Sequence, residues 1–266
     1  MNLKVSISVL ALSVAVLPQS VCSAESGQGL PPLDVVLKRV VERAEKEDEN
    51  DRLFDQAYGY TRVKITEFRN VKGELKKNER NESRHDPRAV PPQPQSQRLA
   101  TKLHSPKDTP QNPRTSDTDT RMRGRAVDRK DLRLDDDLLG RFTFTIVGRE
   151  TVNGRSALVL EFEPKPRKLP ERSLRDKFIN KAAGRVWIDE EDYAVARADL
   201  HLTEKVNVVG GLVGAVWQFE YRFDRERTPD GLWFTRQVRW HLEGREVFVR
   251  RTVDYFEEKT DVCKVQ

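Results

Sequence analysis

Histidines and clustered carboxylates are the residues of this chain whose types could support catalysis or metal binding. His85 and His104 lie in a polar stretch, and His201 and His241 stand singly in segments with strand character. None has a second histidine at helical spacing or a nearby cysteine, so we expect no metal site. The chain also has no Gly-x-Ser-x-Gly elbow, no Walker loop and no dinucleotide fingerprint. We therefore expect no catalytic residues, no cofactor and no enzymatic activity, which disfavours the alternative of a secreted hydrolase.

Acidic runs and two arginines have structural explanations as well as chemical ones. The run Asp135–Asp137 suits the start of a helix, because carboxylates stabilise a helix N-terminus. The run Asp189–Asp192 is expected to form a solvated hairpin turn. Arg149 and Arg155 flank another predicted turn, where they are either surface charges or contacts for lipid headgroups. The glycine-rich segment Val206–Val216 is either a strand bend or a loop that gates a site or touches a membrane.

Residues 1–24 have the pattern of a secretory leader. Lys4 supplies a positive start, and Val5–Leu17 is an apolar run too short for a stable membrane span. We expect cleavage after Ala24 and a periplasmic location. Acylation of Cys22 is the alternative, although the residues before it lack the usual lipoprotein pattern.

Glu79–Arg133 is a polar stretch without Phe, Tyr or Trp. Its surplus of positive charge accounts for the formal net charge of +5 of the whole chain. Few apolar residues are available to offset the entropy of ordering it, so we predict a disordered, basic insert at about 79–133. Such an insert is either a solvated linker or a contact for anionic headgroups. Nucleic acid is not expected as a partner, because no aromatic residue between the positive charges could stack on a base.

The remaining residues predict one mainly-β domain with helices (α+β), running from residue 25 to residue 266 around the insert. Leu33–Glu49 has an apolar stripe at helical spacing and predicts one amphipathic helix. Tyr58–Phe68 alternates like a strand, Glu74–Asn78 is expected to return beside it, and about nine strands are predicted in all. Glu171–Lys181 is expected to form a short helix. The short links favour antiparallel pairing, because parallel neighbours need long crossovers.

The predicted sheet has more apolar surface than one helix can cover. Its face would measure about 43 by 26 Å, and a helix about 25 Å long and 10 Å wide covers about a quarter of it. The sheet must therefore curl around the helix and close on its own side chains, or form a groove for a hydrophobic guest. The candidate ligand-binding residues on this face are Phe142, Phe144, Leu158, Leu160, Trp217, Phe219, Phe234 and Trp240.

The order of elements and two short phrases carry a resemblance to a known family. With the phrases at Val147–Arg155 and Gly184–Asp189, and the wider segment Leu138–Pro164, the chain resembles exported proteins of the outer-membrane lipoprotein-sorting superfamily, the LolA/LolB/RseB-like group. The resemblance implies a curved antiparallel sheet that forms an unclosed β-barrel under an N-terminal helix lid, with a hydrophobic interior for acyl chains. The chain departs from the family by its long basic insert, and none of its arginines can be matched to the carrier's ligand-gating arginine.

The resemblance and the apolar face together predict a periplasmic binding or carrier protein for a lipid, an acyl chain or a lipoprotein. Outer-membrane lipoprotein sorting is one expected role. The alternative is an RseB-like envelope-stress sensor that binds a membrane signalling protein. The expected partners are therefore lipid or lipoprotein acyl chains, a membrane surface and an envelope membrane protein.

Overall fold

The computed structural model describes residues 29–89, 136–208, 214–246 and 249–265. Apart from residues 29 and 30, the described residues belong to one compact unit, Pro31–Gln266. The predicted leader, residues 90–133 of the predicted insert with His104, and residues 209–213 of the glycine-rich segment lie outside the described residues.

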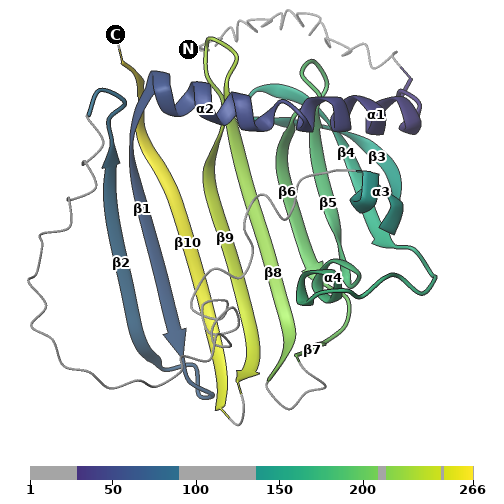
Figure 1. Ribbon diagram of the computed structural model, residues 1–266, viewed down its shortest axis with the longest axis vertical. Helices are drawn as coiled ribbons and strands as arrows, with labels where there is room; N and C mark the ends of the chain where they lie inside the picture. Colours follow the sequence, from purple (N-terminus) through teal and green to yellow (C-terminus); the bar gives the residue numbers. More distant parts are fainter. Residues whose placement is uncertain (1–28, 90–135, 209–213, 247–248, 266) are drawn as a thin grey trace, which may run out of the picture. The chain divides into compact units, whose positions relative to one another are not determined.

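The described strands form one antiparallel sheet of ten strands (Figure 1). Its order is β2-β1-β10-β9-β8-β6-β5-β4-β3, and the short strand β7 pairs with β8. Strands β2 and β3 each have a single partner, so the sheet is open, as predicted. The strand bounds are β1 Tyr58–Arg69, β2 Leu75–His85, β3 Phe142–Val152, β4 Arg155–Pro164, β5 Ala182–Asp189, β6 Val195–Leu202, β7 Val206–Val208, β8 Gly214–Arg227, β9 Trp233–Glu246 and β10 Val249–Lys264.

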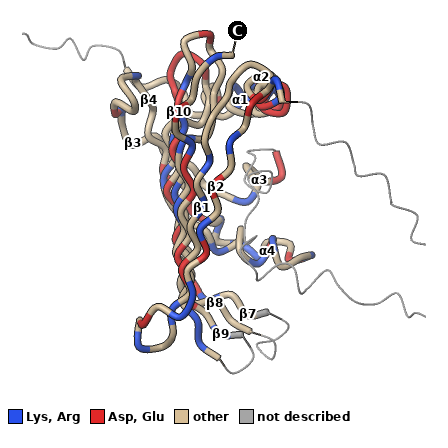
Figure 2. Tube along the Cα trace, turned by 90° about the vertical axis from the view of Figure 1, so that its left-hand side faces the viewer, with Lys and Arg blue, Asp and Glu red and all other residues tan. Residues whose placement is uncertain are grey.

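The four helices of the described ranges lie on one face of this sheet (Figure 2). They are α1 Leu33–Ala44, α2 Glu47–Ala57, α3 Asp136–Arg141 and α4 Leu174–Ile179. Helices α1 and α2 cross the strands near one end of the sheet (Figure 1). No helix in the described ranges is long and apolar enough to cross a membrane.

The prediction of a single helix over Leu33–Glu49 is wrong, because the chain forms two helices there. Helix α1 has the expected stripe and buries Val36 and Val40. Helix α2 has few apolar residues and buries Asn50 beside Phe54. The Asn50 side chain donates to the backbone oxygen of Trp233 (2.6 Å) and accepts from its N–H (2.9 Å). These two hydrogen bonds explain how a polar helix docks on the sheet. They could not be predicted from the spacing of apolar residues, because Asn50 is polar and its partner is distant in the chain.

Strand β2 also extends beyond its predicted end at Asn78. It continues to His85, so residues 79–85 are strand and not disordered insert. Pairing with β1 is nearly continuous, from Arg69 opposite Leu75 to Tyr60 opposite His85. Backbone hydrogen bonds to β1 hold this strand although its side chains are polar and mostly exposed. An edge strand rich in charge is also protected against pairing with another chain.

The two faces of the sheet differ in polarity. The face under the helices carries the main core, which includes Val36 of α1, Leu138 of α3 and Ile179 of α4. Positively and negatively charged residues recur along the strands (Figure 2), and the opposite face carries charged residues such as Asp199, Arg222 and Arg239. A smaller buried cluster around Trp187 and Trp233 covers part of that face.

The tightest backbone approach in the core lies at Gly184 of β5. A Cβ atom there would come within 2.1 Å of the Asp199 oxygen and 2.8 Å of the Leu200 Cα. We expect Gly184→Ala to lower the free energy of unfolding by about 3 kcal/mol, because two backbones would have to separate. Denaturant unfolding measures the change. Gly140→Ala in α3 is the control: nothing lies within 4 Å of its Cβ position, and alanine should leave stability unchanged or raise it. Equal losses in both variants would contradict the role of the close approach.

Candidate functional site

Six of the eight predicted lining residues meet in one cluster. Phe142, Phe144, Leu158, Leu160, Phe219 and Trp240 all belong to the main core, and none is more than 8% exposed. The cross-strand register explains this, because residues that are paired directly across strands point to the same face. Whether these residues contact a ligand remains a prediction.

The other two predicted lining residues lie elsewhere. Phe234 stacks on Phe54 of α2 with ring centroids 4.9 Å apart, in a separate cluster at the far end of the sheet. Trp217 was expected in phase with Phe219, but a register shift between Val216 and Gln218 breaks the alternation. Val216 therefore takes the buried position, and Trp217 is 37% exposed with Arg250 5.4 Å from its ring centroid. A bulge leaves no mark in hydrophobic periodicity, so the pattern could not place Trp217.

The free space in the apolar interior is small. A cavity of about 80 Å³ lies against Phe142 and Phe144 of β3 and beneath Leu138 of α3 and Ile179 of α4. A water molecule occupies about 30 Å³ in the liquid, so this cavity holds roughly three groups of that size. The protein's own side chains fill most of the interior between sheet and helices. The cavity lining is entirely apolar and comprises Leu138, Phe142, Phe144, Phe162, Ile179, Ala182, Val186, Val195, Ala198, Leu200 and Phe223.

The two short helices over this cavity are tied together by Arg141, whose side chain is 5% exposed. Its guanidinium donates to Asp137 (2.8 Å) and to Asn180 (2.8 Å), and pairs with Asp176 (3.0 Å). Helices of six residues are not stable alone, so these contacts and the core hold them in place. We call α3, α4 and this arginine network the Arg141 clamp.

Asp176 is the buried carboxylate of the Arg141 clamp. Burial alone would raise its pKa, but the backbone N–H of Arg172 (2.8 Å) and the Arg141 guanidinium stabilise the charged form and lower the pKa below its usual value. Ser173 caps α4 by accepting from the Asp176 N–H (3.1 Å). The sequence predicted a helix here but gave no sign of its arginine partner, which is distant in the chain.

The carboxylates at Asp189–Asp192 are not all solvated, contrary to the prediction. Asp189 is 1% exposed and accepts from Arg155 Nε (2.7 Å) and from two backbone N–H groups of its own turn. Burial would raise the pKa of Asp189, but Arg155 and these N–H groups lower it. Arg149 pairs in the same way with Glu190 (2.7 Å). Both arginines therefore hold the turn together. Asp136 and Asp137 lie in the first turn of α3, as expected, and Asp135 lies outside the described residues.

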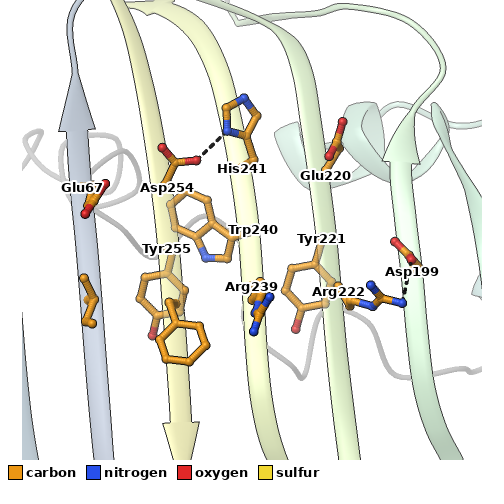
Figure 3. A pocket seen from close by; sticks show the side chains of 12 residues that line it. Glu67, Asp199, Glu220, Tyr221, Arg222, Arg239, Trp240, His241, Asp254 and Tyr255 are labelled. Carbon is orange, nitrogen blue, oxygen red and sulfur yellow. Dashed lines mark hydrogen bonds and ion pairs between the residues drawn. The ribbon is translucent and has the colours of Figure 1, made fainter. Parts of the chain in front are cut away.

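A second and larger hollow lies on the opposite, charged face of the sheet. This polar depression has a volume of about 620 Å³ and crosses β1, β10, β9, β8 and β6 (Figure 3). Two rows of side chains line it, on either side of the row of Tyr221, Trp240 and Tyr255, which also borders it. One row contains Glu67, Asp254, His241 and Glu220, and the other contains Ile65, Phe256, Arg239, Arg222 and Asp199.

His241 is bound firmly within the first row. Its Nδ1 lies 2.6 Å from Asp254 and its Nε2 lies 3.4 Å from Glu243. Burial lowers the pKa of His241, but the two carboxylates outweigh burial and raise it above its ordinary value. Within the described ranges, no three His, Cys, Asp or Glu side chains are grouped so that they could hold a metal ion.

Comparison with known proteins gives likeness in fold only. No family model matches the chain, and no curated protein matches it. Among solved structures, a domain assigned to outer-membrane lipoprotein sorting from Vibrio parahaemolyticus is 12% identical, with a TM-score of 0.32 over 86% of this chain and 93% of the other. A LolA superfamily protein from Nitrosomonas europaea is 10% identical, with a TM-score of 0.30 over 86% and 93%. The Pseudomonas aeruginosa MucA/MucB complex gives 10% identity and a TM-score of 0.22 over 84% and 94%.

At this level of identity the comparisons assign no role to any residue. The solved structures to which the chain is similar include LolA-superfamily, lipoprotein-sorting and MucB proteins.

Proposed function

We propose that this chain is an exported, non-enzymatic binding protein that takes the end of an acyl chain, from a lipid or a lipoprotein, into the cavity under α3 and α4. The observation that carries the proposal is the composition of the cavity: each of its lining residues is apolar. A cavity of this kind stays dry and favours an apolar guest over water. The proposed role is to carry lipoproteins in the periplasm, the compartment to which the predicted leader would direct the chain.

The cavity size sets how binding proceeds. Three methylene groups gain about 2.4 kcal/mol on burial, which alone gives weak affinity. A longer acyl chain needs more room, and the six-residue helices α3 and α4 are the elements that can be displaced with the least loss of structure. The Arg141 clamp opposes that displacement, because separating the helices leaves the buried Asp176 without its cation. Binding is therefore coupled to opening of the clamp.

Filling the cavity tests the site directly. Ala198 lines it and is 3% exposed. We expect Ala198→Leu to occupy the space of about three methylene groups and to weaken binding of a fluorescent fatty acid by about fifty-fold. Thr145→Leu is the control. Thr145 of β3 is exposed on the other face of the sheet, so leucine there adds apolar volume away from the cavity. If Ala198→Leu binds as tightly as Thr145→Leu and both remain folded, the cavity does not seat the acyl chain.

Loosening the Arg141 clamp tests the gate. We expect Arg141→Met to lower the free energy of unfolding by about 3 kcal/mol, because Asp176 stays buried without a cation. We also expect faster association of the fatty acid in stopped-flow fluorescence. Asn180→Ala removes one acceptor of the clamp at a cost of about 1 kcal/mol and keeps the rate measurable if the first variant unfolds.

Arg167→Met is the matched control for the clamp. The Arg167 guanidinium donates to the Gly140 oxygen of α3 (3.0 Å) and does not connect the two helices. It should change neither stability nor association rate. Association rates that stay at the wild-type value in both clamp variants would show that α3 and α4 do not gate entry.

A further inference from the structure

The polar depression combines opposite charges that the protein leaves partly unmatched. Arg222 and Arg239 stand directly opposite each other on β8 and β9. Like charges at directly opposed positions destabilise a sheet. Arg222 is 3.5 Å from Asp199, and Arg239 lies 5.3 Å from the Phe256 ring centroid. Among the described residues Arg239 has no carboxylate within ion-pair distance. An anion placed between the two guanidiniums would relieve this repulsion, as planar guanidiniums bind phosphate well.

A carboxylate is available on the adjacent row. Glu220 precedes Arg222 by two residues on β8, which places it about 7 Å along the strand on the same face. It accepts from the Gln218 amide (3.1 Å), and within the described part of the chain no cation pairs with it. Its directly opposed neighbours are His201 on β6 and His241 on β9, and His241 already contacts Asp254 and Glu243. Figure 3 shows Glu220 in the band of His241 and Asp254, apart from Arg222 and Arg239.

The total charge of the depression selects between classes of ligand. Four carboxylates face two arginines and one histidine there, so a free dianion would be repelled by the acidic row. A ligand that carries both a phosphate and an ammonium group complements both rows. A two-carbon linker between these groups, with hydrogen bonds of about 3 Å at each end, spans a separation of this size.

We propose that the polar depression binds a phosphate-bearing zwitterion of the phosphoethanolamine class, with the phosphate on Arg222 and Arg239 and the ammonium on Glu220. The phosphate accepts charge-assisted hydrogen bonds from the two guanidiniums, and the ammonium donates to the carboxylate. This site lies on the opposite face of the sheet from the apolar cavity, so it stands independently of acyl-chain binding.

Calorimetric titration of the full chain with O-phosphoethanolamine tests the proposal. We expect saturable binding at least ten times tighter than that of inorganic phosphate or ethanolamine alone. Arg239→Gln and Glu220→Gln should each weaken it at least ten-fold. Arg185→Gln is the matched control, because Arg185 is an exposed arginine of the same face that pairs with Glu161 (2.6 Å) outside the depression. Its affinity should equal that of the wild type, and thermal melts should show all three variants folded.

Two further experiments ask whether the bound group belongs to a lipid headgroup or to a free small molecule. Flotation with vesicles of phosphatidylethanolamine in phosphatidylcholine, against phosphatidylcholine alone, asks whether the zwitterion is a headgroup, and soluble phosphoethanolamine should compete if it is. Binding of the soluble compound without vesicle binding assigns the free metabolite. Inorganic phosphate that binds as tightly as phosphoethanolamine, equal affinities of Arg239→Gln and Arg185→Gln, or no binding in either format would overturn the proposal.

Discussion

Cross-strand register is the constraint on which the rest of this structure depends. One row of directly paired residues runs through seven strands on the face under the helices, and it consists of Phe144, Phe162, Gly184, Leu200, Tyr221, Trp240 and Tyr255. Gly184 has no side chain to contribute, and the backbone of β6 fills the space that a Cβ would need. A slip of one residue in any pair would turn this row toward the charged face. The register therefore builds the core, the apolar cavity and the polar depression together.

Buried polar residues fix the helices on this sheet. Asn50 joins α2 to the backbone of Trp233, and Arg225 pairs with Glu47 of α2 at 2.6 Å. Arg141 does the same for α3 and α4. Such ties add little net stability over apolar packing, but loss of one partner leaves a buried charge or amide uncompensated. They fix the position of helices that are too short or too polar to be fixed by packing alone.

The sequence predicted what depends on local periodicity and missed what depends on distant partners. The apolar stripe of α1 and the shared burial of Phe142, Leu158 and Trp240 follow from periodicity along each element. Antiparallel pairing follows from the short links between strands, and the open sheet was implied by the family resemblance. Helix α2 and the outer half of β2 depend on partners that no local pattern contains. For the candidate site, only Phe142 and Phe144 of the eight predicted lining residues line the apolar cavity, and the sequence gave no sign of the Arg141 clamp. The pairing of Arg222 with Arg239 requires the register, which periodicity alone does not fix.

The two hollows share two strands, β6 and β8. On β6, Ala198 and Leu200 line the apolar cavity, and Asp199 between them lines the polar depression. On β8, Phe223 lines the apolar cavity, and its neighbour Arg222 lines the polar depression. Side-chain substitutions can therefore separate the two hollows, since alternate residues serve different faces. A backbone change that shifts register, such as loss of a bulge, must alter both at once. Any coupling between the two hollows would consequently pass through the backbone of β6 and β8, because a side chain lies on one face of the sheet.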